Sequence, residues 1–158
     1  MWAEMLELSR SAGDLVSRSL ELAERDAEAY DGVVSALKLV QESQAQQEAR
    51  RESIQAAMKQ AALVPMETLR VIAKPSGLVE EAIEKGNPNC LCDAAVAVQL
   101  IRAAAIGAVY NVRVNLSNIA DKDFSSRMQS EMASLRNNIV QAVGRLEARM
   151  RRIKFEES

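Results

Sequence analysis

Histidine is absent from the 158 residues of this chain. Its absence removes the usual acid/base group of neutral pH and the commonest zinc ligand, so any proton transfer falls to Asp, Glu, Lys, Tyr or Cys. The two cysteines, Cys90 and Cys92, form a lone C-x-C pair, which falls short of the four ligands of a structural zinc site. We therefore expect no bound metal, and we expect both thiols to be unpaired and buried.

Aromatic residues are also scarce, at 3% of a chain that is 48% hydrophobic. The core must then be filled by Leu, Ile, Val, Met and Ala, which favours interlocked helices over a sandwich of strands. A net charge of −2 provides no field that would attract nucleic acid or anionic lipid. The start of the chain lacks a signal-peptide pattern, and no uncharged apolar run approaches membrane-spanning length. We expect a cytoplasmic protein without a nucleic-acid or membrane partner.

Apolar residues recur at helical spacing along most of the chain. They predict one long helix, or two nearly collinear ones, over about 5–37 and then a polar interval over 41–51. A helix resumes near 54, and Pro65 is expected to end or kink it. A short helix near 69–73 closed by Pro75, and another closed by Gly86, are expected to follow.

An apolar rod from about residue 89 comes next, then a loop over 117–122 and a last helix with Asp121 or Asp123 as its N-cap. The last helix carries a seam close to a heptad pattern and should pack lengthwise on another helix. The sequence thus predicts one all-α domain over 1–158. We expect a multi-helical bundle with long antiparallel helices that forms dimers. Either the rod or the seam is the expected interface. The seam consists of Met128, Met132, Leu135, Ile139, Ala142, Leu146, Met150 and Ile153.

Polar residues bracket the apolar rod and make it the leading candidate for a site. Asn87, Asn89 and Asp93 lie where the rod begins, and Asn111 and Asn115 lie where it ends. At 100° per residue Asp93 and Asn111 share one azimuth and Asn115 is about 40° away, yet Asp93 and Asn111 are about 27 Å apart along an unbroken helix. Either the two ends serve different sites, or a two-fold partner brings them together. Alternatively, Asp93 only offsets the helix dipole.

A second carboxylate falls on an apolar stripe of the first helix. Continuing this stripe past Leu22 leads to Asp26 and Tyr30, which are four residues apart and so close enough to touch. Burial would require a hydrogen bond to Asp26 and would raise its pKa toward the range useful for proton transfer. The other reading places Asp26 at the edge of the stripe or at a helix break.

Four segments occur together in one order: Ala23-Glu24-Arg25-Asp26-Ala27-Glu28-Ala29-Tyr30, Ala61 to Met66, Gly86-Asn87-Pro88-Asn89 through Asp93, and Asn111-Val112-Arg113-Val114-Asn115-Leu116. In this order the chain resembles the formiminotetrahydrofolate cyclodeaminase and methenyltetrahydrofolate cyclohydrolase family over about residues 20–125. The resemblance implies an all-helical dimer that acts on one-carbon units carried by tetrahydrofolate. The residues that match the recurrent polar positions of the family are Asp26, Asn87, Asn89, Asp93, Asn111 and Asn115.

The chain departs from this family at its start. Family members open with a Pro-Gly-Gly-Gly-Ser type segment and an extra helix, whereas this sequence starts inside what would be the next helix, so we expect a truncated form. Cys92 also replaces a frequent serine, and a thiol is the weaker hydrogen-bond partner.

Two functions follow from these observations. The first is a non-catalytic helical dimer that binds a small ligand or serves as a structural module, with Asn87, Asn89, Asn111, Asn115 and Tyr30 as binding residues. The alternative is an active cyclodeaminase or cyclohydrolase without a metal. In that case Asp93 or Asp26 is the general acid/base that acts on a tetrahydrofolate derivative, with ammonia loss or water addition. We expect Asp93, with Asn89 nearby, to line a cleft.

Overall fold

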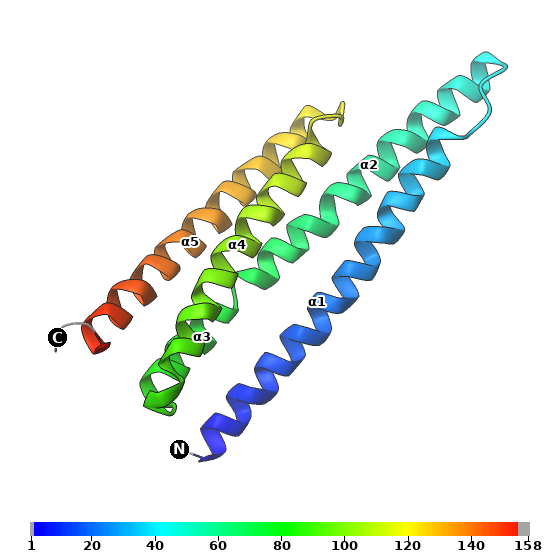
Figure 1. The fold of residues 1–158 in the computed structure, drawn as a ribbon. Coiled ribbons are helices and arrows are strands. Elements are labelled where there is room, and N and C mark those ends of the chain that lie inside the picture. The colour runs from blue at the N-terminus through cyan, green and yellow to red at the C-terminus, as the bar shows by residue number, and fades with distance from the viewer. Residues whose placement is uncertain (1, 155–158) are drawn as a thin grey trace.

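The computed structural model of the chain describes residues 2–154, and every regular element in this range is helical. Four long helices, α1 (Trp2–Leu37), α2 (Gln44–Ile72), α4 (Leu91–Leu116) and α5 (Lys122–Lys154), alternate in direction (Figure 1). A short helix, α3 (Pro75–Lys85), and a 3-10 turn, Pro88–Cys90, connect α2 to α4. The predicted all-α fold with long antiparallel helices is confirmed.

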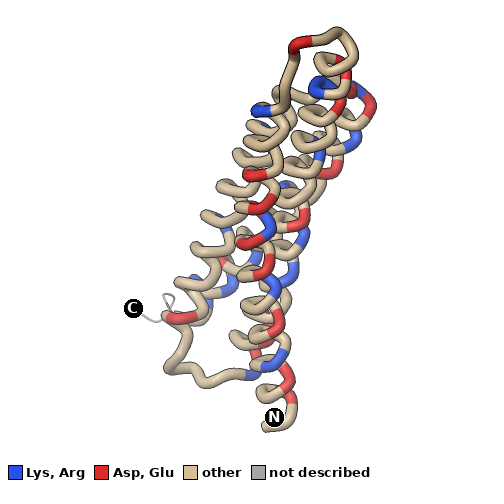
Figure 2. The backbone as a smooth tube through the Cα atoms, turned by 90° about the vertical axis from the view of Figure 1, so that its right-hand side faces the viewer, with Lys and Arg blue, Asp and Glu red and all other residues tan. Residues whose placement is uncertain are grey.

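The helices form an open arrangement in which α2 has a partner helix on each side. It packs against α1 on one side and α4 on the other, and α5 packs against α4. Helices α1 and α4 therefore run in the same direction on either side of α2 (Figure 1). Acidic and basic residues are interspersed along the helices (Figure 2). Because α3 contacts α1, α4 and α5, it joins the two sides at one end of the molecule.

The polar interval predicted over 41–51 is wrong in its extent, because α2 begins at Gln44. Ser43 is the N-cap in a capping box. Its Oγ accepts from the backbone N–H of Gln46 at 3.3 Å, and the Gln46 Oε1 accepts from the N–H of Ser43 at 2.9 Å. These bonds satisfy two donors that a helix start would otherwise leave open. The polar residues that follow are the exposed first turns of a helix.

Two further predictions of helix ends were wrong. Pro65 lies buried inside α2 and does not end it, since the neighbouring turns are held by contacts with the rest of the core, so the predicted end is wrong and the alternative, a kink, stays a prediction. The short helix predicted near residue 69 is the last part of α2. Pro75 does not close a helix but opens α3, where its fixed φ and missing N–H are tolerated. Gly86 does follow the end of α3, as predicted.

The start of α5 agrees with the sequence. Asp121 is its cap, accepting a hydrogen bond from the backbone N–H of Phe124 at 2.9 Å. The same carboxylate receives Lys59 Nζ of α2 at 2.7 Å. One side chain therefore both caps α5 and joins it to α2.

Buried side chains form two separate clusters. The large cluster joins α2, α4 and α5 and includes Met66, Leu69, Val98 and Val112, none of which is exposed. The small cluster joins α1 to α2 through Leu22, Val64 and Val71. Most of the predicted seam of α5 is buried in the large cluster, so the seam packs inside the protomer. Its outlying member Ile153 is 50% exposed.

Candidate functional site

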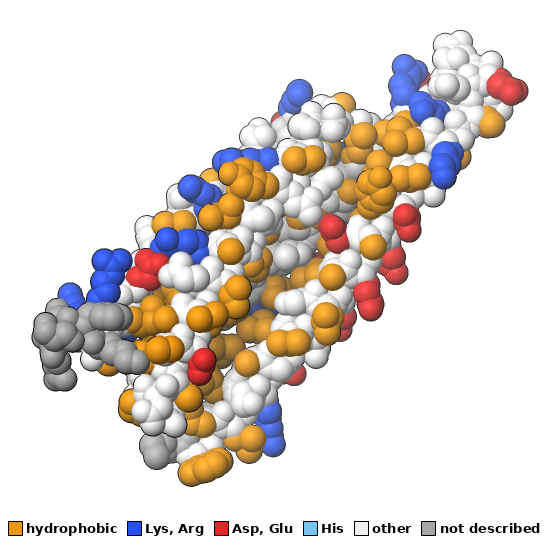
Figure 3. Space-filling view, viewed as in Figure 1, with side chains coloured by type: hydrophobic (Ala, Val, Ile, Leu, Met, Phe, Trp, Pro, Cys, Tyr) orange, Lys and Arg blue, Asp and Glu red, His pale blue; other side chains and the backbone are white. Residues whose placement is uncertain are grey.

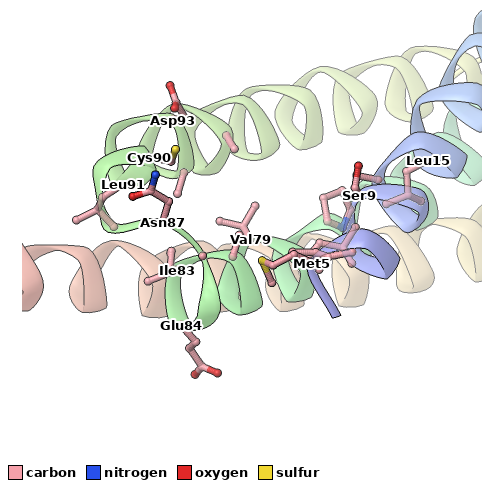
Figure 4. A pocket seen from close by; sticks show the side chains of 18 of the residues that line it. Met5, Ser9, Leu15, Val79, Ile83, Glu84, Asn87, Cys90, Leu91 and Asp93 are labelled. Carbon is pink, nitrogen blue, oxygen red and sulfur yellow. The ribbon is translucent and has the colours of Figure 1, made fainter. Parts of the chain in front are cut away.

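A groove lies between the first half of α1, α3 and the start of α4. Its volume is about 870 Å³, and its lining is predominantly aliphatic (Figure 4). Side chains of α1 and α4 form facing walls because both helices pack on α2 and α3 rather than on each other. The groove is visible as a hollow flanked by hydrophobic side chains in Figure 3. Its apolar lining includes Met5, Leu8, Leu15, Val16, Leu20, Leu78, Val79, Ile83, Leu91 and Ala97.

The turn before α4 forms one end of the groove and brings Asn87, Pro88 and Cys90 to its lining. Asn87 caps the 3-10 turn, because its Oδ1 accepts the backbone N–H of Asn89 at 3.0 Å. Gly86 is required here, since a Cβ at this position would lie 2.3 Å from the carbonyl oxygen of Ala82. The Asn87 side chain therefore holds the turn that shapes the groove.

Asp93 is exposed in the first turn of α4 and belongs to the groove lining. In Figure 4 its carboxylate points away from the groove, on the side of α4 opposite Val79 and Ile83. Glu84 is the other charged lining residue, and it points away from the groove to pair with Arg149 of α5 at 2.6 Å. The groove is thus an apolar trough, and the carboxylates of its two charged lining residues are both turned away from it.

The remaining polar candidates do not converge on the groove within one protomer. Asn89 is exposed and outside the groove lining. Asn111 and Asn115 lie near the other end of α4, where the Asn115 Nδ2 donates to the Asn111 Oδ1 at 2.8 Å. The two amides thus bond to each other on one side of the helix.

Asp26 and Tyr30 also lie outside the groove. Asp26 is half-buried, Tyr30 is 67% exposed, and no hydrogen bond joins them. Of the two readings, the half-buried Asp26 fits the one that places it at the edge of the stripe, and a buried Asp26–Tyr30 pair is not formed. Beyond Leu22 the buried face of α1 continues through Ala29, which packs on the small cluster with α2, and Ala36, and Tyr30 lies off this face.

The expectation of buried cysteines is also wrong. Both thiols are exposed and neither is in a disulfide, so only the prediction that they are unpaired with each other is confirmed. Cys90 is exposed because the turn that carries it forms the open end of the groove. Within residues 2–154, no three His, Cys, Asp or Glu side chains gather in a way that could hold a metal ion.

Carboxylates with lowered pKa values lie between helices rather than in the groove. The pKa of Glu67 is lowered because Arg18 and then Arg25, both from α1, donate hydrogen bonds to it. The pKa of Glu147 in α5 is lowered chiefly by the hydrogen bond from Gln99 of α4. These charges hold helices in place.

Sequence reasoning missed the wall that α1 and α3 contribute to the groove. The apolar spacing of α1 predicted a face that packs on another helix. Only part of this face meets α2, and the residues from Met5 to Leu20 that turn away from it line the groove. The one available signal was the breadth of the apolar stripe, since Val16 and Leu20 widen it beyond the width that a single partner covers.

Comparison with known proteins places this helical architecture in a family. A family model described as formiminotransferase-cyclodeaminase matches residues 1–134. The chain belongs to this family. A solved structure of formiminotetrahydrofolate cyclodeaminase from Thermotoga maritima superposes with a TM-score of 0.82 at 28% identity, over 96% of this chain and 71% of that chain.

Curated relatives include a methenyltetrahydrofolate cyclohydrolase and formimidoyltransferase-cyclodeaminases. Methenyltetrahydrofolate cyclohydrolase from Methylorubrum extorquens is 36% identical over 110 residues, which are 70% of this chain and 53% of the relative. Formimidoyltransferase-cyclodeaminase from Rattus norvegicus is 27% identical over 132 residues, which are 81% of this chain and 24% of the relative. The chain thus spans about half of the bacterial relative and a quarter of the mammalian one.

Proposed function

We propose that this chain is a ligand-binding member of the family that holds a tetrahydrofolate derivative in the groove without turning it over. The observation that carries the proposal is the distribution of the polar candidates. The groove has one carboxylate at its rim, Asp93, whereas Asp26, Asn111 and Asn115 lie elsewhere on α1 and α4. Acid/base chemistry needs a group within hydrogen-bond reach of the reacting atoms, and a lone rim carboxylate supplies binding more readily than catalysis.

The shape and polarity of the groove support a ring-shaped ligand with N–H donors. Its volume of about 870 Å³ lies within the range of small-molecule sites. Aliphatic walls such as Leu15, Val79 and Ile83 suit the flat faces of a reduced pterin ring. A carboxylate accepts hydrogen bonds from ring amino and N–H groups, and Asp93 would do so after its side chain rotates toward the groove.

Ligand-linked stabilisation tests this proposal. We expect a reduced folate to raise the melting temperature of the wild type and Asp93→Asn to remove most of this increase. Asp123→Asn is the matched control, because Asp123 occupies the first turn of α5 and is also exposed. Loss of either helix-dipole interaction should cost about 1 kcal/mol or less. Equal ligand binding by wild type and Asp93→Asn would reject the site.

Turnover is the second candidate function, and the likeness to a methenyltetrahydrofolate cyclohydrolase favours it. In this reading Asp93 or Asp26 acts as general acid/base in water addition to the methenyl bridge, or in cyclisation with loss of ammonia. With purified protein, loss of the methenyl absorbance reports water addition and its gain from a formimino substrate reports cyclisation, and either change separates turnover from binding. Turnover that falls with Asp93→Asn but not with Asp123→Asn supports catalysis, and stoichiometric binding without turnover supports the first proposal.

We further propose that residues 1–158 form one soluble domain that self-associates. The support is the large hydrophobic surface left on α1 and α4, where Leu20 is 63% exposed and Leu100 is 63% exposed. Exposed apolar patches of this kind mark interaction sites. Light scattering at micromolar concentration tests this proposal, and a mass equal to one chain contradicts it.

A further inference from the structure

The lining of the groove contains a nucleophile that the proposed ligand site does not use. Cys90, in the turn before α4, is exposed and belongs to the lining, and it is not in a disulfide. Cys92 is two residues further on and is also exposed, but it lies outside the lining. The thiolate of an exposed cysteine is the form that attacks acyl groups. One thiol therefore adjoins the groove, and its neighbour provides a direct comparison.

The groove extends from the turn that carries Cys90 along the first half of α1. The ion pair between Lys85 and Glu4, at 3.6 Å, places the end of α3 beside the start of α1. The lining on α1 then runs from Met5 to Leu20, which is about 22 Å along the helix axis. In Figure 4 Cys90 accordingly lies toward one end of the view and Leu15 toward the other. This length is close to that of an extended palmitoyl chain.

The interior of the groove suits an uncharged aliphatic chain. Among the described residues, those that line it include no aromatic side chain, and the carboxylates of Glu84 and Asp93 are turned away from it. A free fatty acid would bring its own carboxylate, and Lys85 beside the turn already pairs with Glu4 and Glu81. An acyl thioester brings only a neutral carbonyl group, whose burial costs far less than that of an unpaired charge.

We propose that Cys90 is a site of S-acylation and that the groove holds the attached long acyl chain. The Cys90 sulfur attacks the carbonyl carbon of a long-chain acyl-coenzyme A. The new bond from Sγ to this carbon replaces the carbon–sulfur bond to coenzyme A, which leaves as a thiol with the proton that Cys90 gives up. One thioester is exchanged for another, so no oxidant or reductant is needed. Contacts between the chain and the groove hold the carbonyl group beside Cys90 and favour its thiol over that of Cys92.

Acylation also controls the proposed ligand site, a consequence that rests on the proposed function. A chain that runs from Cys90 toward Leu20 passes the aliphatic walls formed by Leu15 and Val79. A reduced folate uses the same walls and the same volume of about 870 Å³. The acylated protein is therefore closed to the folate, and removal of the acyl group opens it again.

A lipid bilayer is the other environment that accepts an acyl chain. The helix from Pro88 to Leu116, which carries Cys90, is long and apolar enough to cross a membrane, the one such helix among residues 2–154. Within the protein, however, α4 packs on α2 and α5. The groove adjoins Cys90 without any rearrangement of these helices, so we expect the chain to enter the groove and the acylated protein to stay off vesicles.

Acylation of the purified protein tests which thiol reacts. Wild type, Cys90→Ser and Cys92→Ser are incubated with palmitoyl-coenzyme A, and intact mass before and after hydroxylamine counts the chains held as thioesters. We expect one chain on the wild type and on Cys92→Ser, and reaction of Cys90→Ser to be at least tenfold slower. Equal slowing in both variants, or no acylation of the wild type, overturns the proposal. Flotation of the acylated wild type with phosphatidylcholine vesicles would overturn the groove as the place of the chain.

A charge placed in the wall tests the role of the groove. Val16 lines the groove and is 61% exposed, so Val16→Glu does not have to bury its carboxylate in the unmodified protein. Ser17 is exposed and outside the lining, so Ser17→Glu is the matched control. We expect Val16→Glu to slow palmitoyl transfer at least tenfold and to leave acetyl transfer from acetyl-coenzyme A unchanged. Ser17→Glu should slow neither. Equal rates of palmitoyl transfer to the two variants would overturn the groove as the chain site.

Ligand-linked stabilisation separates this proposal from the proposed function. Reduced folate should raise the melting temperature of the unmodified wild type and leave that of the palmitoylated protein unchanged. Absence of any increase in the unmodified protein contradicts the proposed function, and the acylation assays then decide the modification of Cys90 by themselves. An equal increase in both forms overturns control of the ligand site by the acyl chain.

Discussion

Two regions of this molecule differ in how they are held in place: the block of α2, α4 and α5, and helix α1. Helices α2, α4 and α5 share one continuous core, which α3 closes at one end, and its central side chains are fully buried. Helix α1 is attached to α2 by a much smaller cluster around Leu22. The ion pairs from Arg18 and Arg25 of α1 to Glu67 of α2 supplement that cluster.

This difference explains where the groove lies. Because α2 covers only one side of α1, the rest of the apolar face of α1 is left uncovered. This remaining face forms one wall of the groove. Helix α3, the turn before α4 and the start of α4 supply the opposite wall. A ligand bound in the groove would contact both regions and should stabilise the attachment of α1 most.

Matched core substitutions give the largest expected contrast. Leu69 is fully buried in the large cluster and Leu22 is 2% exposed in the small one. Removing a buried leucine side chain costs about 2–5 kcal/mol, depending on how well the site collapses. We expect Leu69→Ala near the upper end, with cooperative loss of all helices in denaturant. Leu22→Ala should lie near the lower end and speed amide exchange in α1 before the other helices. Equal losses with equal exchange patterns would contradict the comparison.

Gly86→Ala perturbs the joint at which α3 links the two regions. The added Cβ would meet the Ala82 carbonyl oxygen, so the backbone must shift, at a cost of about 1–3 kcal/mol. Gly77→Ala in the same helix is the control, because its Cβ would meet no atom within 4 Å. We expect Gly77→Ala to be neutral or slightly stabilising in thermal unfolding. A neutral Gly86→Ala would show that the turn does not need glycine.

Glu67→Gln weakens the electrostatic attachment of α1. The pKa of Glu67 is lower in the folded protein than in the unfolded chain, because Arg18 and Arg25 favour its charged form. Its stabilisation is therefore complete above the unfolded value of about 4.3 and is lost as the pH falls through the lower folded value. We expect Glu67→Gln to cost about 1 kcal/mol at neutral pH.

The difference between wild type and Glu67→Gln should disappear in acid, when the carboxylate of the wild type is protonated as well. Urea unfolding at several pH values measures it. Glu48→Gln is the control, since Glu48 pairs with Arg51 on the exposed surface of α2 and does not join two helices. A constant difference down to strong acid would contradict the role of Glu67.

The cysteines should give the smallest effect. Because both are exposed, Cys90→Ser and Cys92→Ser should each change stability by less than about 0.5 kcal/mol. Both thiols of the native protein should also react with a small thiol reagent without denaturant. Reaction only after unfolding would show that the two thiols are covered in the native protein. It would indicate that a second copy or another partner lies against this end of α4.

Local features of the sequence were sufficient to predict most of the helices. Apolar spacing placed α1 and α4, and Asp121 marked the start of α5, because periodicity and capping act within a few residues. The family resemblance rested on short segments such as Asn111 to Leu116 and is confirmed by the family match. The failure at Pro65 is different in kind. A local rule predicted a break there, and contacts from distant helices outweighed it.

The sequence by itself determined the helical class, the absence of histidine chemistry and the family, since these depend on composition and on neighbours in the chain. Only the tertiary structure decided that α1 is half covered, that Asp93 lies at the rim of a groove and that Cys90 is exposed. The apolar stripe of a helix does not specify which helix covers it. That depends on packing between segments far apart in the sequence, and here α2 lies between α1 and α4 and leaves their facing sides open.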